Sequence, residues 1–176
     1  MEKIRSANLF VIGEPKSLFT PDEINILKQY LEEGGNLLIL QGEQGDTKNN
    51  TNLNNFLKDY GLTFHGDSVV RTAFYKYFHP KQCFIDTLTV HPGFLRTIKN
   101  IKKKKKIDLM EDELGQDDDD DDCPLKIIYP FGQSIDIDPK KSNISVLFTS
   151  GKIAFPMNRP LCAVTTSKIK KENYVF

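Results

Sequence analysis

The chain has 176 residues, in which 24 lysines and arginines balance 24 aspartates and glutamates. This length predicts one domain, or one domain with an appendage, and the net charge favours no class of partner. Three cysteines without close spacing indicate a reducing compartment rather than a disulfide framework. No apolar run reaches membrane-spanning length, so we expect a soluble, cytosolic protein.

The clearest pattern is a helix that begins after Thr20. Thr20 is suited to cap this helix, Pro21 to occupy its first turn and Glu23 to complete a capping box. Apolar residues then recur at three- and four-residue steps as far as Leu31. The pair at residues 34–35 consists of glycines, which we expect to supply the left-handed backbone that ends a helix.

Apolar runs flank this helix on both sides, at residues 8–13 and 37–40. Unbroken runs of this kind are typical of strands covered on both faces. Strand, helix and strand together predict a β-α-β unit with a parallel pair and a right-handed crossover. The polar loop at residues 41–50 would then lie at the carboxyl end of a strand, where open α/β sheets bind their ligands.

The remaining patterns predict a strand-rich carboxyl-terminal part that adds strands to the same sheet. The expected elements are a short helix at 52–60, strands at 62–64 and 83–90, a helix starting near residue 92, and strands at 144–149 and 161–166. Residues 99–124 contain five consecutive lysines and six consecutive aspartates. Such charge runs repel themselves, so we interpret this segment as a solvated insertion.

Motifs for catalysis or cofactor binding are weak. The segment at 13–16 has one glycine, a glutamate and a proline, and therefore does not match a phosphate-binding loop. None of the three cysteines has the small neighbours of a nucleophile elbow, and we expect Cys83 and Cys162 to be packing residues. His65, His79 and His91 lack the spacing of a metal motif. We therefore predict no catalytic residue, no cofactor and no metal.

Several stretches together resemble one family, in the same order along the chain. They are FTPDE at 19–23, LEEGG at 31–35, the glycines and glutamate of 42–45, NLN at 52–54, YG at 60–61, VVRTAFYKYFHPK at 69–81, YPFG at 129–132 and FPMNRP at 155–160. The chain resembles the GIFT domain, the amino-terminal domain of the fifty-two-kilodalton subunit of intraflagellar transport complex B. The likeness covers nearly all of the chain outside residues 99–124.

The resemblance implies an α/β domain with a Rossmann-like, glutamine-amidotransferase-like layered fold. It implies a parallel or mixed sheet with helices on both faces, and a non-enzymatic scaffold that helps join the core of the complex to its peripheral part. The implied partners are a tetratricopeptide-repeat subunit and a pair of calponin-homology and coiled-coil subunits, without nucleic acid or membrane insertion. The implied location is the cilium or flagellum and its basal body, with a cytoplasmic pool.

The resemblance also implies a parent chain longer than residues 1–176, which we expect to form a single GIFT-type domain. The charged segment at 99–124 has no counterpart in the family pattern. We therefore expect neither a subunit-binding role for it nor a contact with tubulin.

Physical arguments select seven candidates for a protein interface: Glu43, Asn52, Arg71, Tyr75, Tyr77, His79 and Arg159. Several combine aromatic area with a polar group, as interface anchors do, and an internal structural role is the alternative for each. A second function stays open, a catalytically degenerate amidotransferase-like domain with a small-molecule site at the strand ends. A deep pocket joining Glu43, Arg71 and His79 would favour that second function, and a filled surface would favour the scaffold.

Overall fold

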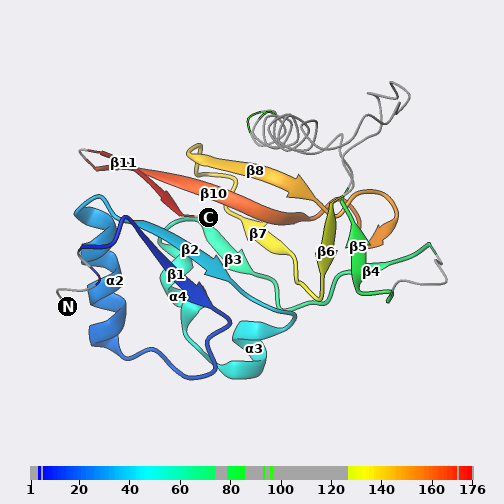
Figure 1. Cartoon of the computed structure of the whole chain (residues 1–176), viewed down its shortest axis with the longest axis horizontal. Coiled ribbons are helices and arrows are strands. Elements are labelled where there is room, and N and C mark those ends of the chain that lie inside the picture. The colour runs from blue at the N-terminus through cyan, green and yellow to red at the C-terminus, as the bar shows by residue number, and fades with distance from the viewer. Residues whose placement is uncertain are drawn as a thin grey trace, which may run out of the picture.

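The computed structural model describes residues 4, 6–73, 79–85, 93, 96, 127–169 and 171–175. Helices and strands alternate at first, and strands follow one another in the second half (Figure 1). The elements are β1 (Leu9–Gly13), α2 (Pro21–Glu32), β2 (Asn36–Leu40), α3 (Gly45–Asn49), α4 (Leu53–Lys58), β3 (Leu62–Phe64), β4 (Val70–Arg71), β5 (Gln82–Phe84), β6 (Ile128–Pro130), β7 (Ile135–Ile137), β8 (Ile144–Thr149), β9 (Ala154–Phe155), β10 (Pro160–Ile169) and β11 (Lys171–Val175).

A five-stranded mixed sheet has the strand order β1-β2-β11-β10-β8. β1 and β2 are parallel, as the β-α-β pattern predicted, and β10 is antiparallel to both β8 and β11. The carboxyl-terminal strands therefore extend the sheet that the first strands open, which confirms that part of the sequence analysis. The place of β11 between β2 and β10 was not predicted.

Three further pairs of strands form small antiparallel sheets, β3 with β7, β4 with β9 and β5 with β6. Each joins segments far apart in the sequence, and none belongs to the five-stranded sheet. β7 and β9 have too few residues for an alternating pattern to predict them. Among the described residues, no helix is both long and apolar enough to cross a membrane.

Helix α2 begins as the sequence predicted. The Thr20 hydroxyl accepts the Glu23 N–H at 3.3 Å, and the Glu23 carboxylate accepts the Thr20 N–H at 2.8 Å. Gly34 has φ 98°, so it supplies the left-handed residue at the helix end. The same expectation for Gly35 is wrong, because Gly35 does not have a positive φ. An added Cβ at Gly35 would lie 2.2 Å from the Tyr30 ring. Gly35 is therefore suited to close packing.

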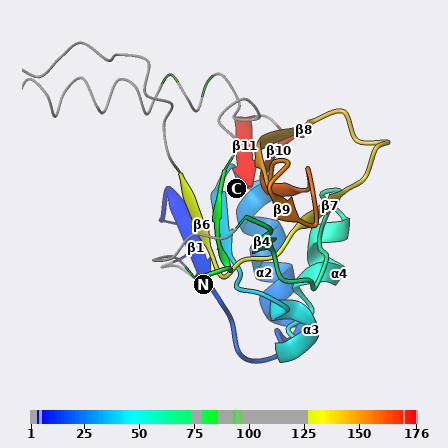
Figure 2. The same ribbon diagram turned by 90° about the vertical axis from the view of Figure 1, so that its right-hand side faces the viewer.

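The larger core, the sheet–helix cluster, lies between the helices and one face of β1 and β2. Its buried members include Ile12, Leu27, Leu31, Leu37 and Phe56. Figure 2 shows α2, α3 and α4 on one side of β1. The expected burial on both faces is wrong for these strands: Leu9, Val11 and Leu40 are 46%, 48% and 53% exposed.

A smaller core, the small-sheet cluster, contains Val69, Cys83, Ile85, Ala154 and Leu161. The polar loop expected at 41–50 is wrong in part, because α3 forms within it. Only the first three residues of the strand expected at 83–90 are described, of which Cys83 and Phe84 end β5. The rest of that strand and the charged segment at 99–124 lie outside the described residues, and of the helix expected near residue 92 the structure describes only Gly93 and Arg96, both helical.

Candidate functional site

The carboxyl ends of β1 and β2 meet two loops from elsewhere in the chain. The Glu14 N–H donates to the Leu40 carbonyl at 2.7 Å, which joins the two strand ends. The Glu43 N–H donates to the Phe131 carbonyl at 3.0 Å, and the Phe131 N–H donates to the Lys81 carbonyl at 2.9 Å. Because these backbone bonds connect residues distant in sequence, the loops after β2, before β5 and after β6 form one unit.

Glu43 reinforces this unit with its side chain. Its carboxylate accepts a hydrogen bond from Lys81 Nζ at 2.5 Å and another from the Ser68 hydroxyl. Hydrogen bonds from Lys81 and then Ser68 lower the pKa of Glu43 from its ordinary value. Bound in this way, the Glu43 carboxylate joins the loop after β2 to the segments that hold Ser68 and Lys81.

Arg71 is buried, with 6% of its surface exposed. Its Nε donates to the Ala73 carbonyl at 2.7 Å and its Nη1 donates to the Gln82 carbonyl at 3.0 Å. The guanidinium also lies 5.2 Å from the centre of the Phe84 ring. This geometry suits an internal brace between β4 and β5, which leaves little of Arg71 for a partner.

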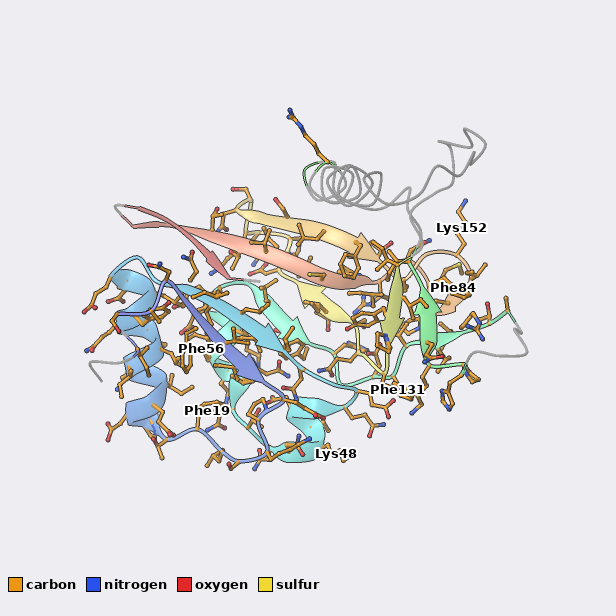
Figure 3. All side chains as sticks on the ribbon, in the orientation of Figure 1. Phe19, Lys48, Phe56, Phe84, Phe131 and Lys152 are labelled. Carbon is orange, nitrogen blue, oxygen red and sulfur yellow. The ribbon has the colours of Figure 1, made fainter. Side chains whose placement is uncertain are left out.

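His79 is exposed and lies beside an aromatic side chain that the sequence analysis missed. The His79 and Phe131 rings are 5.1 Å apart with 33° between their planes, and Phe131 is 46% exposed. Phe131 has φ 50°, an uncommon conformation for a residue with a side chain, which indicates a strained turn that presents this ring. Figure 3 labels Phe131 near the lower end of β6. Tyr75 and Tyr77 lie outside the described residues.

Asn52 and Arg159 have other surroundings. The Asn52 amide donates to the Phe19 carbonyl at 3.3 Å and borders a small depression between α2 and α4. Arg159 pairs with the Asp136 carboxylate, which also lies 2.8 Å from Nδ1 of His65. Among the described contacts none joins Asn52 to Glu43.

A cavity of about 700 Å³ does lie near the strand ends, but its wall is mainly apolar. Glu43, Arg71 and His79 are not part of that wall. The convergence of polar groups that would favour a small-molecule site is therefore missing from the described residues. Gln41 borders the cavity, and its buried amide has no hydrogen-bond partner in the described part of the chain.

Neither of the two described cysteine thiols lies in surroundings that favour reactivity. Burial raises the pKa of Cys83, and it raises the pKa of Cys162 to about 11, which disfavours both thiolates near neutral pH. Within the described ranges, no three histidine, cysteine, aspartate or glutamate side chains are placed to hold a metal ion.

Further exposed apolar residues, missed in the sequence analysis, lie between β8 and β10. Ile153 and Met157 are in turns and Phe155 ends β9, and they are 42%, 57% and 67% exposed. Phe155 and Met157 belong to the FPMNRP stretch, and Phe131 belongs to the YPFG stretch.

Fold and site together define a mixed α/β domain in which Glu43 and Arg71 brace loops and do not line the cavity. A family model described as the IFT52 GIFT domain matches residues 1–176, and the chain belongs to this family, which is generally non-catalytic. The chain is similar to intraflagellar transport protein 52 homologues of Mus musculus and Homo sapiens, with 34% and 33% identity over 167 residues, or 95% of the chain.

The chain spans 37% of the mouse relative and 36% of the human relative. A solved structure described as the mmIFT52 N-terminal domain is also similar, with a TM-score of 0.74 and 28% identity. That likeness covers 99% of this chain and 67% of the solved chain. The family resemblance found in the sequence is thereby confirmed.

Proposed function

We propose that this domain is a non-enzymatic scaffold within a subunit of intraflagellar transport complex B. One observation carries the proposal: Glu43 and Arg71, two of the charged candidates, are occupied in holding loops together. Glu43 is bound to Lys81 and Ser68, and Arg71 is bound to backbone carbonyls. What these contacts support is a rigid surface for other proteins. The full-length relatives named as intraflagellar transport proteins support the same assignment.

We extend this proposal to the partners, the cellular location and the architecture of the domain. The domain helps to assemble the core and join it to the peripheral part, next to a tetratricopeptide-repeat subunit and a calponin-homology and coiled-coil pair. It acts in the cilium and basal body, with a cytoplasmic pool. The chain forms one domain, and residues 99–124 are an insertion in it. This domain has the Rossmann-like, amidotransferase-like layered fold, in which α2 and α4 form one helical layer.

The surface we assign to partner binding is the His79 surface, formed by His79, Pro80, Pro130 and Phe131. All four residues are exposed. The His79 and Phe131 rings lie in contact at a tilt, and backbone bonds to Lys81 and Glu43 fix the turn before any partner arrives. Rigid aromatic side chains lose little conformational entropy on binding, so they suit interface anchors.

Size-exclusion co-migration with the tetratricopeptide-repeat subunit and the calponin-homology pair tests both the function and the surface. Phe131→Asn removes the ring and keeps a residue that tolerates positive φ. Leu18→Asn is the matched control, because Leu18 is 55% exposed and is not part of the His79 surface. We expect the wild-type domain and Leu18→Asn to share a peak with the partners, and Phe131→Asn to elute separately.

The other outcomes separate function from surface. A shared peak that survives Phe131→Asn supports the scaffold and rejects the His79 surface. A folded wild-type domain that elutes without any of these partners contradicts the scaffold role of this domain. The small-molecule alternative has one observation in its favour, the cavity near the strand ends, but the wall of that cavity is mainly apolar and does not include Glu43, Arg71 or His79.

A further inference from the structure

The loop between β8 and β10 presents a cluster of apolar side chains that the proposed function leaves without a role. Ile153, Phe155 and Met157 are exposed, whereas Ala154 is buried. The exposed side chains are two positions apart, so they lie on the outer side of the loop while Ala154 faces the small-sheet cluster. Large apolar side chains gathered on one surface mark interaction sites in soluble proteins. We call these three exposed residues the β9 surface.

Hydrogen bonds hold the β9 surface in place. The Ser150 N–H donates to the Arg159 carbonyl at 2.9 Å, and the Arg159 N–H donates to the Ser150 hydroxyl at 3.0 Å. The same hydroxyl donates to the Pro156 carbonyl at 2.7 Å. The residue after β4 supports the loop as well, because the Thr72 N–H donates to the Ile153 carbonyl at 2.9 Å. A surface that is ordered before binding loses less conformational entropy when a partner docks.

One positive charge borders the β9 surface. Lys152 precedes Ile153 and is exposed, and Figure 3 shows its side chain projecting away from the ribbon. Residues 150–160 contain no aspartate or glutamate. Arg159 is the other cation of this loop, and it is already paired with Asp136. Lys152 has no such ion pair among the described contacts, so the surface is complementary to apolar side chains that lie beside a carboxylate.

We propose that the β9 surface and Lys152 bind an amphipathic helix of a partner protein, whose apolar stripe is flanked by aspartate or glutamate. Such a helix presents both groups at once, because apolar and charged residues occupy adjoining faces. This binding rests on the proposed scaffold function and gives the domain a second contact surface. Arg71 connects it to the His79 surface, since Arg71 pairs with Ala154 and its N–H donates to the Pro80 carbonyl at 2.7 Å. Figure 2 shows β4 beside β9.

Other occupants fit the β9 surface less well. A strand could not extend β9, which has two residues and is followed by prolines at 156 and 160 that lack an N–H. A second copy of this chain would place the β9 surface against itself, and two Lys152 side chains would meet without a carboxylate from this loop. An acidic membrane attracts clusters of lysine and arginine, whereas Lys152 is the single lysine of residues 150–160.

Site-specific crosslinking in the full-length protein tests the proposed contact. A photoreactive benzoylphenylalanine replaces Phe155, and the protein is mixed with the tetratricopeptide-repeat subunit and the calponin-homology and coiled-coil pair. After irradiation, mass spectrometry should place the crosslinks on one helix with apolar residues at three- and four-residue steps and an aspartate or glutamate beside them. The same probe at Leu18, which is also exposed, should not crosslink to that helix.

Charge reversal then tests the carboxylate. Lys152→Glu should weaken binding of the crosslinked subunit at least tenfold in a fluorescence titration, because it places a like charge against the partner. A lysine in place of the partner's carboxylate should restore binding to this variant. Lys140→Glu is the matched control, because Lys140 is exposed, lies outside this loop and changes the net charge by the same amount. Wild-type binding by Lys152→Glu would contradict the acidic flank.

Other results would also overturn the proposal. A complex that forms on size exclusion without crosslinks from position 155 rejects the β9 surface and leaves the scaffold function standing. Crosslinks confined to the same chain or to a second copy assign the surface to an intramolecular or dimeric contact. Flotation of the full-length protein with phosphatidylserine vesicles, lost in Phe155→Ser, assigns the surface to a membrane. The absence of any complex with these subunits rejects the scaffold function together with this contact.

Discussion

The two hydrophobic cores of this domain are stabilised in different ways. The sheet–helix cluster is apolar apart from Tyr30, whose hydroxyl lies 3.0 Å from the Asn36 carbonyl and accepts the Asn36 N–H at 3.2 Å. The small-sheet cluster has fewer buried apolar residues among those described, and polar side chains are buried around it. They are Arg71, Gln133, Ser134 and Ser150.

The polar side chains near the smaller cluster replace regular secondary structure. Asp67 accepts both the N–H and the hydroxyl of Ser134 at 2.7 Å, and Ser150 donates to the Pro156 carbonyl at 2.7 Å. Two-residue and three-residue strands satisfy few backbone groups, so side chains must satisfy the others. The comparison teaches that the sheet–helix cluster has the larger apolar core, whereas the small-sheet cluster depends more on side-chain hydrogen bonds to hold its short strands and turns in place.

Phe56→Ala should have the largest effect, because it removes a ring that is 2% exposed in the sheet–helix cluster. We expect the free energy of unfolding in urea to fall by about 4 kcal/mol, through lost burial and the cavity left behind. Phe155→Ala is the matched control, because its ring is 67% exposed. This substitution should change the free energy of unfolding by less than about 0.5 kcal/mol. Equal losses would mean that the two exposures are wrong.

Arg71→Met should cause the second-largest loss of unfolding free energy, and the structural change should be confined to β4 and β5. Removing the guanidinium leaves the Ala73 and Gln82 carbonyls without their donors, at a cost of about 3 kcal/mol. Hydrogen exchange should accelerate in β4 and β5 and stay unchanged in α2. Arg71→Lys should recover only part of the loss, because an ammonium group lacks the planar fork of a guanidinium. Full recovery with lysine would show that charge alone matters at this position.

Gly35→Ala and Gly13→Ala form a matched pair on either side of α2. At Gly35 the new Cβ would lie 2.2 Å from the Tyr30 ring, whereas at Gly13 no atom lies within 4 Å. We expect Gly35→Ala to lower the unfolding free energy by about 2 kcal/mol, because Tyr30 must move. Gly13→Ala should be neutral or stabilising by about 0.5 kcal/mol, through lower entropy of the unfolded chain. A harmless Gly35→Ala would disprove the packing role.

Sequence patterns were most informative where structure depends on neighbours in the chain. The Thr20 capping box, the Gly34 helix end and the strand at Ile144–Thr149 are all local, and all were predicted. The contact between Glu43 and Lys81 joins residues 38 positions apart, so no spacing rule could have indicated it. Exposure of Leu9 and Leu40 was missed for a related reason, since an apolar run shows that a strand is apolar but not what covers it.

The smallest loss of unfolding free energy is expected when Asp136 is replaced, because its contacts are partly open to water. Burial raises the pKa of Asp136, but hydrogen bonds from His65 and Arg159 outweigh it, and the net pKa is lowered. A lowered pKa stabilises the fold above the unfolded-state value of about 4, and this contribution is lost as the pH falls through the folded-state pKa. Asp136→Asn should therefore cost less than about 1 kcal/mol at pH 6, because partly exposed pairs are screened. The wild-type advantage in urea unfolding should disappear at a pH below this lowered folded-state pKa. An advantage that persists at that pH would show that the Asp136 side chain acts through packing and not through its charge.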